Sequence, residues 1–428
     1  MSYKTNISGY MLILALITSL GQLQSCKEDP TLAVLTTGQI TDITINSASL
    51  SGNITDNGRA EITARGFCWG LDPQPTLDDE FIPSGTGSGT FSATISELDP
   101  NTRYHVRAYA ENSVGVAYGN DAEFVTSTAP PAVTTAQVTN IAAITASCGG
   151  NVTYDGGAQI TSRGVCWSTS PQPDITASHS SDGTGSGSFP STLSNLSPAT
   201  IYYVRAYATN GSWTVYGEEF TFRTKLTDTD GNLYNTVFIG SQLWMTENLR
   251  TTTLNDNTAI PEIQDNTQWV SLTTPEYCWY DNSITFKVTY GALYNWYTVN
   301  TGKLCPNGWH VPTDADFSVL ETALGMAASQ AEVWGYRGTD HGLKMKNTTG
   351  WEDSGNGTNS SGFTALPGGY RYGLDGMYML QTTITYWWTA SEHDADRGWY
   401  RRLDSSSDQV YRASTSKKGG KYVRCVRN

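Results

Sequence analysis

Between residues 31 and 225, short runs of β-branched and aromatic residues alternate with clusters of glycine, proline, asparagine and serine. Such runs, interrupted by turn-forming residues at short intervals, are typical of strands in a β-sandwich. The pattern occurs twice, because Gly66-Phe-Cys-Trp69 returns 98 positions later as Gly164-Val-Cys-Trp167. A repeat at constant offset predicts two copies of one folding unit, residues 33–128 and 131–225.

Each copy places a tyrosine shortly before a strand, in Leu98-Asp-Pro-Asn-Thr-Arg-Tyr-His-Val106 and in Leu196-Ser-Pro-Ala-Thr-Ile-Tyr-Tyr-Val204. A tyrosine at this position can fold its hydroxyl back onto the preceding corner of the chain. On these residues the copies resemble fibronectin type III domains, and Trp69 and Trp167 are then expected in their cores. The resemblance favours a role as spacers over a role in binding.

Residues 226–428 have a different pattern: they hold ten of the 13 tryptophans but show one clear amphipathic helix. That helix is expected over residues 313–325, where Thr313 caps the start, Phe317, Leu320 and Leu324 share a face, and Gly325 ends it. The segment ends on an expected strand, residues 421–427. We therefore expect an α+β domain rich in loops, and a mostly β protein as a whole.

Four motifs and a C-terminal strand of this segment are similar to one family, the Fibrobacter succinogenes major paralogous domain. The motifs are Gln242-Leu-Trp-Met-Thr-Glu-Asn-Leu249, Tyr290-Gly-Ala-Leu-Tyr-Asn-Trp-Tyr297, Cys305-Pro-Asn-Gly-Trp-His-Val-Pro-Thr313 and Gly362-Phe-Thr-Ala-Leu-Pro-Gly-Gly-Tyr-Arg371; the strand is Val423-Arg-Cys-Val-Arg427. The resemblance implies a C-type-lectin-like fold and a disulfide between Cys305 and Cys425. It implies no particular activity, because the family has none that is settled.

The N-terminus reads as an export signal. An apolar run from Tyr10 to Leu20 is too short to span a bilayer and predicts a signal peptide over residues 1–25. Leu23-Gln-Ser-Cys26 resembles a bacterial lipobox, so Cys26 is the expected lipidated residue and residues 26–32 a tether. The alternative is a soluble secreted protein with an ordinary Cys26 thiol. The first interpretation predicts a protein at the cell outer membrane, exposed on its surface and touching the membrane through its lipid alone.

Charge narrows the set of partners. The formal net charge of −14 argues against nucleic acid, or an anionic membrane surface, as a partner of the whole chain. Residues 386–428 differ, with nine Lys and Arg against five Asp and Glu. The C-terminal edge is therefore a basic region of an acidic protein.

Four further cysteines are expected to have little chemistry. Cys68 and Cys166 occupy equivalent positions and read as buried thiols, and Cys148 reads as another core position. Export also permits a Cys148–Cys166 bridge. Once Cys305 and Cys425 are paired, Cys278 is left over.

Candidate metal and catalytic sites are weak. Asp228, Asp230 and Asn232 could begin a calcium loop but lack the other ligands, and Asp230-Gly231 suits a hairpin turn better. The histidines lack zinc-ligand spacing, and no nucleophile motif stands out. We therefore expect no cofactor, no metal and no enzyme. The lectin-like resemblance also implies a rival, an enzyme of the formylglycine-generating type with paired reactive cysteines.

The best candidate site is a ligand surface near the C-terminus, in which aromatic and charged residues alternate. Strands are expected near residues 399–403 and 409–412, with Trp399 and Arg401 on one face and Tyr400 and Arg402 on the other. Aromatic faces bordered by Arg and Asp suit sugars or peptides. The candidate residues are Asp394, Asp396, Arg397, Trp399, Arg401, Arg402, Asp404, Asp408 and Arg412. The alternative is that the tryptophans fill a core and the charges are simply solvated.

The sequence thus favours a surface lipoprotein whose C-terminal domain binds a carbohydrate or a protein receptor. A structural subunit of an envelope or fimbrial assembly is the second hypothesis. A hydrolase or oxidase is the third and least favoured hypothesis, because no group of residues supplies the chemistry that such an enzyme needs.

Overall fold

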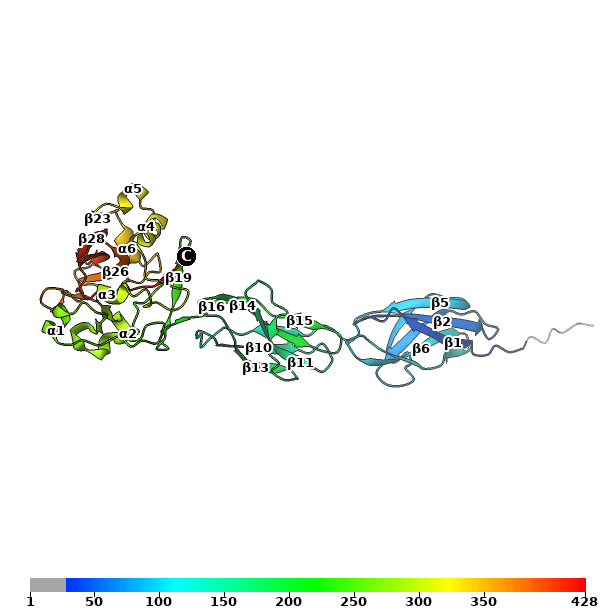
Figure 1. Ribbon diagram of the computed structural model, residues 1–428. Helices are drawn as coiled ribbons and strands as arrows, with labels where there is room; N and C mark the ends of the chain where they lie inside the picture. Colours follow the sequence, from blue (N-terminus) through cyan, green and yellow to red (C-terminus); the bar gives the residue numbers. More distant parts are fainter. Residues whose placement is uncertain (1–27) are drawn as a thin grey trace, which may run out of the picture. The chain divides into compact units, whose positions relative to one another are not determined.

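The computed structural model describes residues 28–428, which divide into two compact units with their boundary in the sequence between Ala129 and Pro130. The chain is mostly β, in several antiparallel sheets (Figure 1). The predicted signal peptide and Cys26 lie outside the described residues.

The first sandwich has a three-stranded sheet and a five-stranded sheet around one core. The smaller sheet is β1 (Val34–Thr41), β2 (Ala48–Asp56) and β5 (Gly89–Ile95); the larger is β3 (Ala64–Gly70), β4 (Glu80–Pro83), β6 (Arg103–Asn112), β7 (Gly115–Tyr118) and β8 (Ala122–Val125). Leu50 and Phe91 from one sheet pack with Phe67 and Val106 from the other, and Trp69 packs against this core. Alternate residues of each strand therefore face inward, as the sequence pattern predicts.

The second sandwich repeats this topology. Its smaller sheet is β9 (Ala132–Thr135), β10 (Ala146–Tyr154) and β13 (Gly187–Leu193); its larger sheet is β11 (Ser162–Ser168), β12 (Ser178–His179), β14 (Ile201–Thr209), β15 (Thr214–Tyr216) and β16 (Phe220–Arg223). Trp167 is buried in its core. The expected tyrosine corners are present: the Asp99 N–H donates to the Tyr104 hydroxyl at 3.0 Å, and the Ser197 N–H donates to the Tyr202 hydroxyl at 3.0 Å.

The cysteines of the sandwiches are buried free thiols. Burial raises the pKa of Cys68 and of Cys166 to about 12, so both stay protonated and unreactive. Cys148 donates its thiol to the Ala136 carbonyl, and the Cys148–Cys166 bridge that the sequence left open is not formed.

The C-terminal domain consists of short elements joined by long loops. Its strands are β17 (Leu226–Thr227), β18 (Leu233–Tyr234), β19 (Thr236–Ile239), β20 (Gln242–Met245), β21 (Tyr277–Cys278), β22 (Leu293–Tyr294), β23 (Gly335–Arg337), β24 (Tyr370–Arg371), β25 (Tyr378–Met379), β26 (Ile384–Glu392), β27 (Arg397–Asp404), β28 (Val410–Ser416) and β29 (Val426–Arg427). Its helices are α1 (Asn266–Ser271), α2 (Lys287–Tyr290), α3 (Trp296–Val299), α4 (Asp314–Ala323), α5 (Ala328–Ala331) and α6 (His341–Met345), with 3₁₀ turns at Tyr280–Asn282 and Ile284–Phe286.

The predicted helix is α4, the longest helix of the described chain. Thr313 and Asp316 form a reciprocal capping box at its start. Its apolar face, Phe317 and Leu320, packs into a core that includes Trp387 and Leu403. Because Trp387 and Leu403 belong to β26 and β27, α4 covers one face of the antiparallel sheet β23-β28-β27-β26.

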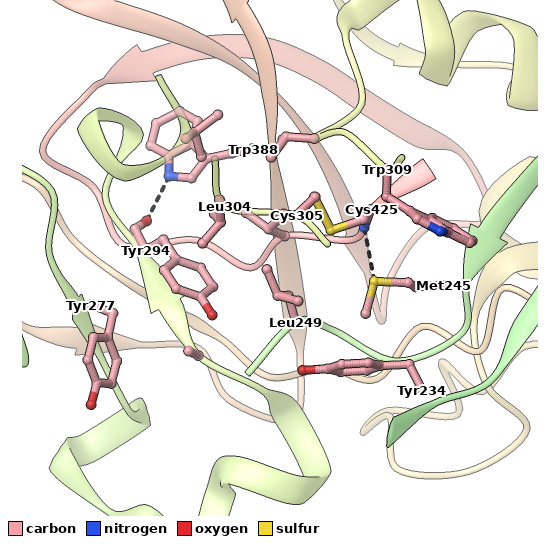
Figure 2. Close-up of a cluster of buried hydrophobic side chains, with 14 of the residues drawn as sticks. Tyr234, Met245, Leu249, Tyr277, Tyr294, Leu304, Cys305, Trp309, Trp388 and Cys425 are labelled. Atoms are coloured by element: carbon pink, nitrogen blue, oxygen red, sulfur yellow. Dashed lines mark hydrogen bonds between the residues drawn. A yellow bond between two sulfur atoms is a disulfide. The ribbon is translucent and has the colours of Figure 1, made fainter. Parts of the chain in front are cut away.

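A disulfide joins two distant parts of the domain. Cys305, nine residues before α4, is bonded to Cys425 next to β29, which confirms the pairing that the resemblance implied. Around the bridge, the Trp388 indole N–H donates to the Tyr294 carbonyl at 2.9 Å (Figure 2). Cys278 is a buried free thiol, as expected.

The Asp230-Gly231 turn between β17 and β18 is a hairpin turn, as predicted. Gly231 has a φ of 79°, and both carboxylate oxygens of Asp228 accept hydrogen bonds, one of them from the Tyr234 hydroxyl. The Asp228 carboxylate therefore stabilises the turn through these hydrogen bonds. Within residues 28–428, no group of three or more His, Cys, Asp or Glu is arranged for a metal ion, and no helix is long and apolar enough to cross a membrane.

Candidate functional site

The two faces of the C-terminal sheet separate the predicted ligand residues. Trp387, Arg401 and Arg412 are direct cross-strand neighbours and share the face that α4 covers. Tyr386, Arg402 and Tyr411 are also cross-strand neighbours, on the opposite face. Arg401 and Arg402, although adjacent in sequence, therefore lie on opposite faces of the sheet.

Arg401 and Arg412 are not available to a ligand, which corrects the prediction for both. Arg401 is 0% exposed and Arg412 is 7% exposed. Arg412 binds both carboxylate oxygens of Asp314, and Arg401 binds Asp314 and Glu321. Although burial alone would raise the pKa of Asp314, the two guanidinium groups lower it below its usual value. These arginines attach α4 to the sheet.

Arg402 lies on the opposite face and is also held in place. Its guanidinium stacks on Tyr411, 4.0 Å from the ring centroid, and donates to Asp404 at 3.0 Å and to the Tyr336 hydroxyl at 2.7 Å. Asp404 is buried beside Arg402, so its carboxylate balances the positive charge of the guanidinium. Asp408 is exposed on the following turn, 3.5 Å from the Lys346 ammonium. The predicted aromatic and arginine pairing therefore exists, but as a packed cluster.

The remaining predicted residues lie at the turn between β26 and β27 and in the first residues of β27. The Asp394 side chain accepts the backbone N–H groups of Asp396 and Arg397, which fixes the turn. Trp399 is half-buried, with its ring 4.6 Å from that of Trp334 and beneath the Arg412 guanidinium at 3.8 Å. Asp394, Asp396 and Arg397 remain exposed.

A hollow that the sequence did not reveal lies on the face opposite α4. We call it the tyrosine pocket. It has a volume of about 80 Å³ and is lined by Tyr370, Tyr372, Gly373, Tyr386, Tyr400, Thr415, Gly419 and Lys421. The lining comes from β24, β26, β27, β28 and the loop before β29. Segments up to about 50 residues apart in sequence therefore build one small site.

A second hollow adjoins the tyrosine pocket, and we call it the outer shelf. It has a volume of about 280 Å³ and shares Tyr372, Gly373 and Thr415 with the pocket. Its other lining residues are Leu374, Arg397, Ser414 and Ser416. Of the ligand residues predicted from the sequence, Arg397 lines the outer shelf. Pocket and shelf together can hold a ligand much larger than the pocket alone.

Burial governs the electrostatics of the tyrosine pocket. Burial raises the pKa of Tyr386 to about 12 and also raises the pKa values of Tyr370 and Tyr400, so all three hydroxyls stay protonated near neutral pH. Burial lowers the pKa of Lys421 to about 7. The pocket therefore offers hydroxyl donors, aromatic rings and one cation, a set suited to recognition of a polar ligand.

One sequence signal could have located part of this site. Tyr370 and Tyr372 are two residues apart, so in an extended segment they point to the same side, and Tyr386 and Tyr400 face each other diagonally across β26 and β27. Nothing in the local sequence marks Lys421, which stands in the loop Lys417-Lys-Gly-Gly-Lys421 among other lysines.

The fold and this surface define a mostly β, multidomain protein with a helix-poor C-terminal domain that carries an aromatic hollow. Residues 237–427 match the family model described as Fibrobacter succinogenes major domain, so that domain is present in the chain. The sequence comparison with curated proteins found no significant match. Among solved structures, the sensor domain of the anti-sigma factor RsgI4 of Pseudobacteroides cellulosolvens is 18% identical with a TM-score of 0.18, over 22% of this chain and 94% of that one.

Proposed function

We propose that this protein is a cell-surface lipoprotein whose C-terminal domain binds a carbohydrate or a protein receptor. The observation that carries the proposal is the tyrosine pocket with its outer shelf. Tyrosine rings supply contact area with little loss of side-chain entropy, and their hydroxyls supply polar contacts. Such a surface suits adhesion or recognition better than reaction chemistry.

The rest of the chain supports display of this surface. The two sandwiches are fibronectin type III-like in strand order and in their tyrosine corners, and they act as spacers. The C-terminal domain is C-type-lectin-like, with its loops stapled by Cys305–Cys425. Lipid on Cys26 anchors the chain to the outer membrane, and the protein contacts the membrane through this lipid alone.

The cysteines support a binding role over an enzyme of the formylglycine-generating type. Cys305 and Cys425 are bonded to each other, and Cys278 is fully buried. Burial raises the pKa of Cys278 to about 11, so it is a protonated thiol at neutral pH. A reactive cysteine pair would need an accessible thiolate.

A structural role in an envelope or fimbrial assembly is the second candidate, favoured by one apolar surface. The β24–β25 hairpin exposes Leu374, Met377, Met379 and Leu380, each at least 39% accessible. Exposed clusters of this kind are typical of protein contacts. In that role the apolar side chains of the hairpin, not the hydroxyls and the cation of the tyrosine pocket, would meet the partner.

A screen of the full chain on glycan and surface-protein arrays tests the proposal. Binding of at least one glycan or receptor, with competition by the same molecule in solution, is the expected result. Capture of other copies of the chain or of its own envelope subunits, with no glycan or receptor retained, would support the structural role instead.

A further inference from the structure

Lys421 is a buried cation that lacks an anionic partner. It is 3% exposed, and its ammonium lies 4.6 Å from the Trp388 ring centroid, 4.8 Å from that of Tyr386 and 5.2 Å from that of Tyr400. Within residues 28–428, its ammonium makes no hydrogen bond and no ion pair. Aromatic faces attract a cation, but they replace only part of the lost hydration.

Other buried cations of the same domain have hydrogen-bond acceptors within the protein. Each of them donates to at least one carbonyl or carboxylate oxygen: Lys346 to Asp404 and Ser407, Arg371 to Ile263 and Gly376, Arg401 to Asp314 and Glu321, and Arg424 to Phe363 and Thr364. Buried charges in proteins are normally satisfied in this way. Lys421 instead lines the tyrosine pocket.

The pocket also contains hydrogen-bond donors that the protein does not use. Among the described residues, no hydrogen bond is made by the hydroxyl of Tyr370, Tyr372 or Tyr400. Donors around one cation match the two oxygens of a carboxylate.

We propose that the tyrosine pocket receives the carboxylate of an acidic saccharide, with Lys421 as its counter-ion and tyrosine hydroxyls as further donors. The proposal rests on the proposed binding function and names its ligand class. A volume of about 80 Å³ fits a small ligand group, not a whole sugar ring. The ring lies on the outer shelf, whose lining includes Arg397, Thr415 and Ser416.

A cationic ligand does not fit, although boxes of aromatic rings often bind cations. Here the chain's own ammonium occupies the centre of the box, so a second cation would be repelled. A saccharide is favoured over an acidic peptide because the lining combines aromatic faces with hydroxyl groups.

The charges around Lys421 predict how binding depends on pH. The groups that face it are tyrosines of β24, β26 and β27; beyond them lie Arg402 beside Tyr386 and Asp375 near Tyr370. On its own loop, Lys417 pairs with Glu392 and Lys418 donates to the Val270 carbonyl. Since the pKa of Lys421 is about 7 without ligand, a bound carboxylate raises it. Affinity is then constant between about pH 5 and pH 7, where the carboxylate is ionised and Lys421 is protonated, and it falls up to tenfold per pH unit above about pH 7.

The experiment compares paired probes by calorimetry on the full chain. Each uronate- or sialate-bearing oligosaccharide is measured beside its methyl ester, which keeps the sugar and removes the charge, and polyglutamate serves as an acidic peptide. The variant Lys421→Met keeps the length of the side chain without its charge, and Lys344→Met, a half-exposed lysine of α6, is the control. Both variants are first checked by thermal melting.

We expect at least one acid to bind ten times more tightly than its ester, and Lys421→Met to remove that difference while the ester binds as before. The weakening above about pH 7 should disappear in Lys421→Met and persist in Lys344→Met. Equal affinity for every acid and its ester, or full affinity in a folded Lys421→Met protein, overturns the proposal. Preference for polyglutamate overturns the saccharide class. Binding of neutral sugars alone overturns this inference and leaves the proposed function intact, whereas no binding of any glycan or receptor contradicts both.

Discussion

Asp314, the first residue of α4, binds Arg412 of β28 through both carboxylate oxygens, with Nε and Nη2 at 2.9 Å and 2.6 Å from Oδ1 and Oδ2. The same carboxylate accepts from Arg401 of β27. One acidic side chain thus links the helix to two strands. The guanidinium groups that the sequence suggested for a ligand are used to assemble the scaffold.

Replacement of Asp314 by Asn should therefore destabilise the C-terminal domain. Two buried guanidinium groups would lose a carboxylate, and breaking a buried ion pair on one side typically costs about 3 to 5 kcal/mol. Urea unfolding followed by tryptophan fluorescence measures the change, since ten of the 13 tryptophans lie in this domain. Asp340→Asn is the matched control: Asp340 pairs with Lys344 at the surface, so its replacement should destabilise the domain far less than Asp314→Asn does. Equal losses in the two variants would contradict the buried role of Asp314.

The Cys305–Cys425 disulfide closes a separation of 120 residues. Closing a loop of this size contributes roughly 4 to 5 kcal/mol in the chain-entropy model, so the Cys305→Ser variant should unfold at much lower urea concentration. Peptide mapping without reduction should recover the two cysteines as one cross-linked pair. Native protein in which both are alkylated by a thiol reagent would refute the bridge.

Glu276 should make stability depend on pH. It is fully buried, Asn295 donates to its Oε1 at 2.8 Å, and its Oε2 has no partner among the described residues. Burial raises its pKa to about 7, from an ordinary value near 4.5. A folded-state pKa above the unfolded value gives stability that is full below about pH 4.5 and is lost as pH rises through about 7.

Glu276→Gln removes this titration and keeps the acceptor for Asn295. Its free energy of unfolding should match wild type near about pH 4 and exceed it by up to roughly 3 kcal/mol near about pH 8, at about 1.4 kcal/mol per pKa unit. Glu352→Gln, at an exposed position, should change neither value. A constant difference between wild type and Glu276→Gln across this range would show that Glu276 does not titrate there.

The lipid anchor is a prediction about Cys26, which precedes the described residues. Wild type should partition into the detergent phase of a cell extract, and Cys26→Ala into the aqueous phase. Cys68→Ala, which removes a buried thiol from the first sandwich, should partition like wild type. Aqueous partition of wild type would favour the secreted form.

Local patterns were sufficient to predict the architecture. The sandwiches, the tyrosine corners, the helix with its Thr313 cap and the Asp230-Gly231 turn each depend on a few neighbouring residues, so their signals stand in the sequence itself. The family resemblance supplied the one long-range feature, the Cys305–Cys425 bridge.

The site could not be predicted in the same way, because burial of an arginine depends on partners far away in the chain. Alternation along β27 correctly sends Arg401 and Arg402 to opposite faces. It cannot show that Asp314 and Glu321, on a helix about 80 residues earlier, cover the Arg401 face. Nor can it show that Lys421 meets tyrosines from three strands. The tertiary fold decides which charges are structural.

The most direct test of the proposed binding surface is to fill the tyrosine pocket and the outer shelf with a large side chain. Thr415 lines both the tyrosine pocket and the outer shelf, so Thr415→Trp should block the two hollows with the fold intact, and Ser360→Trp places the same ring at an exposed position outside them. The measurement is the dissociation constant of the array-identified ligand for the full chain, with thermal melting of each variant. We predict at least a 30-fold weakening, or about 2 kcal/mol, for Thr415→Trp and none for Ser360→Trp. Unchanged affinity in a folded Thr415→Trp protein would contradict the account.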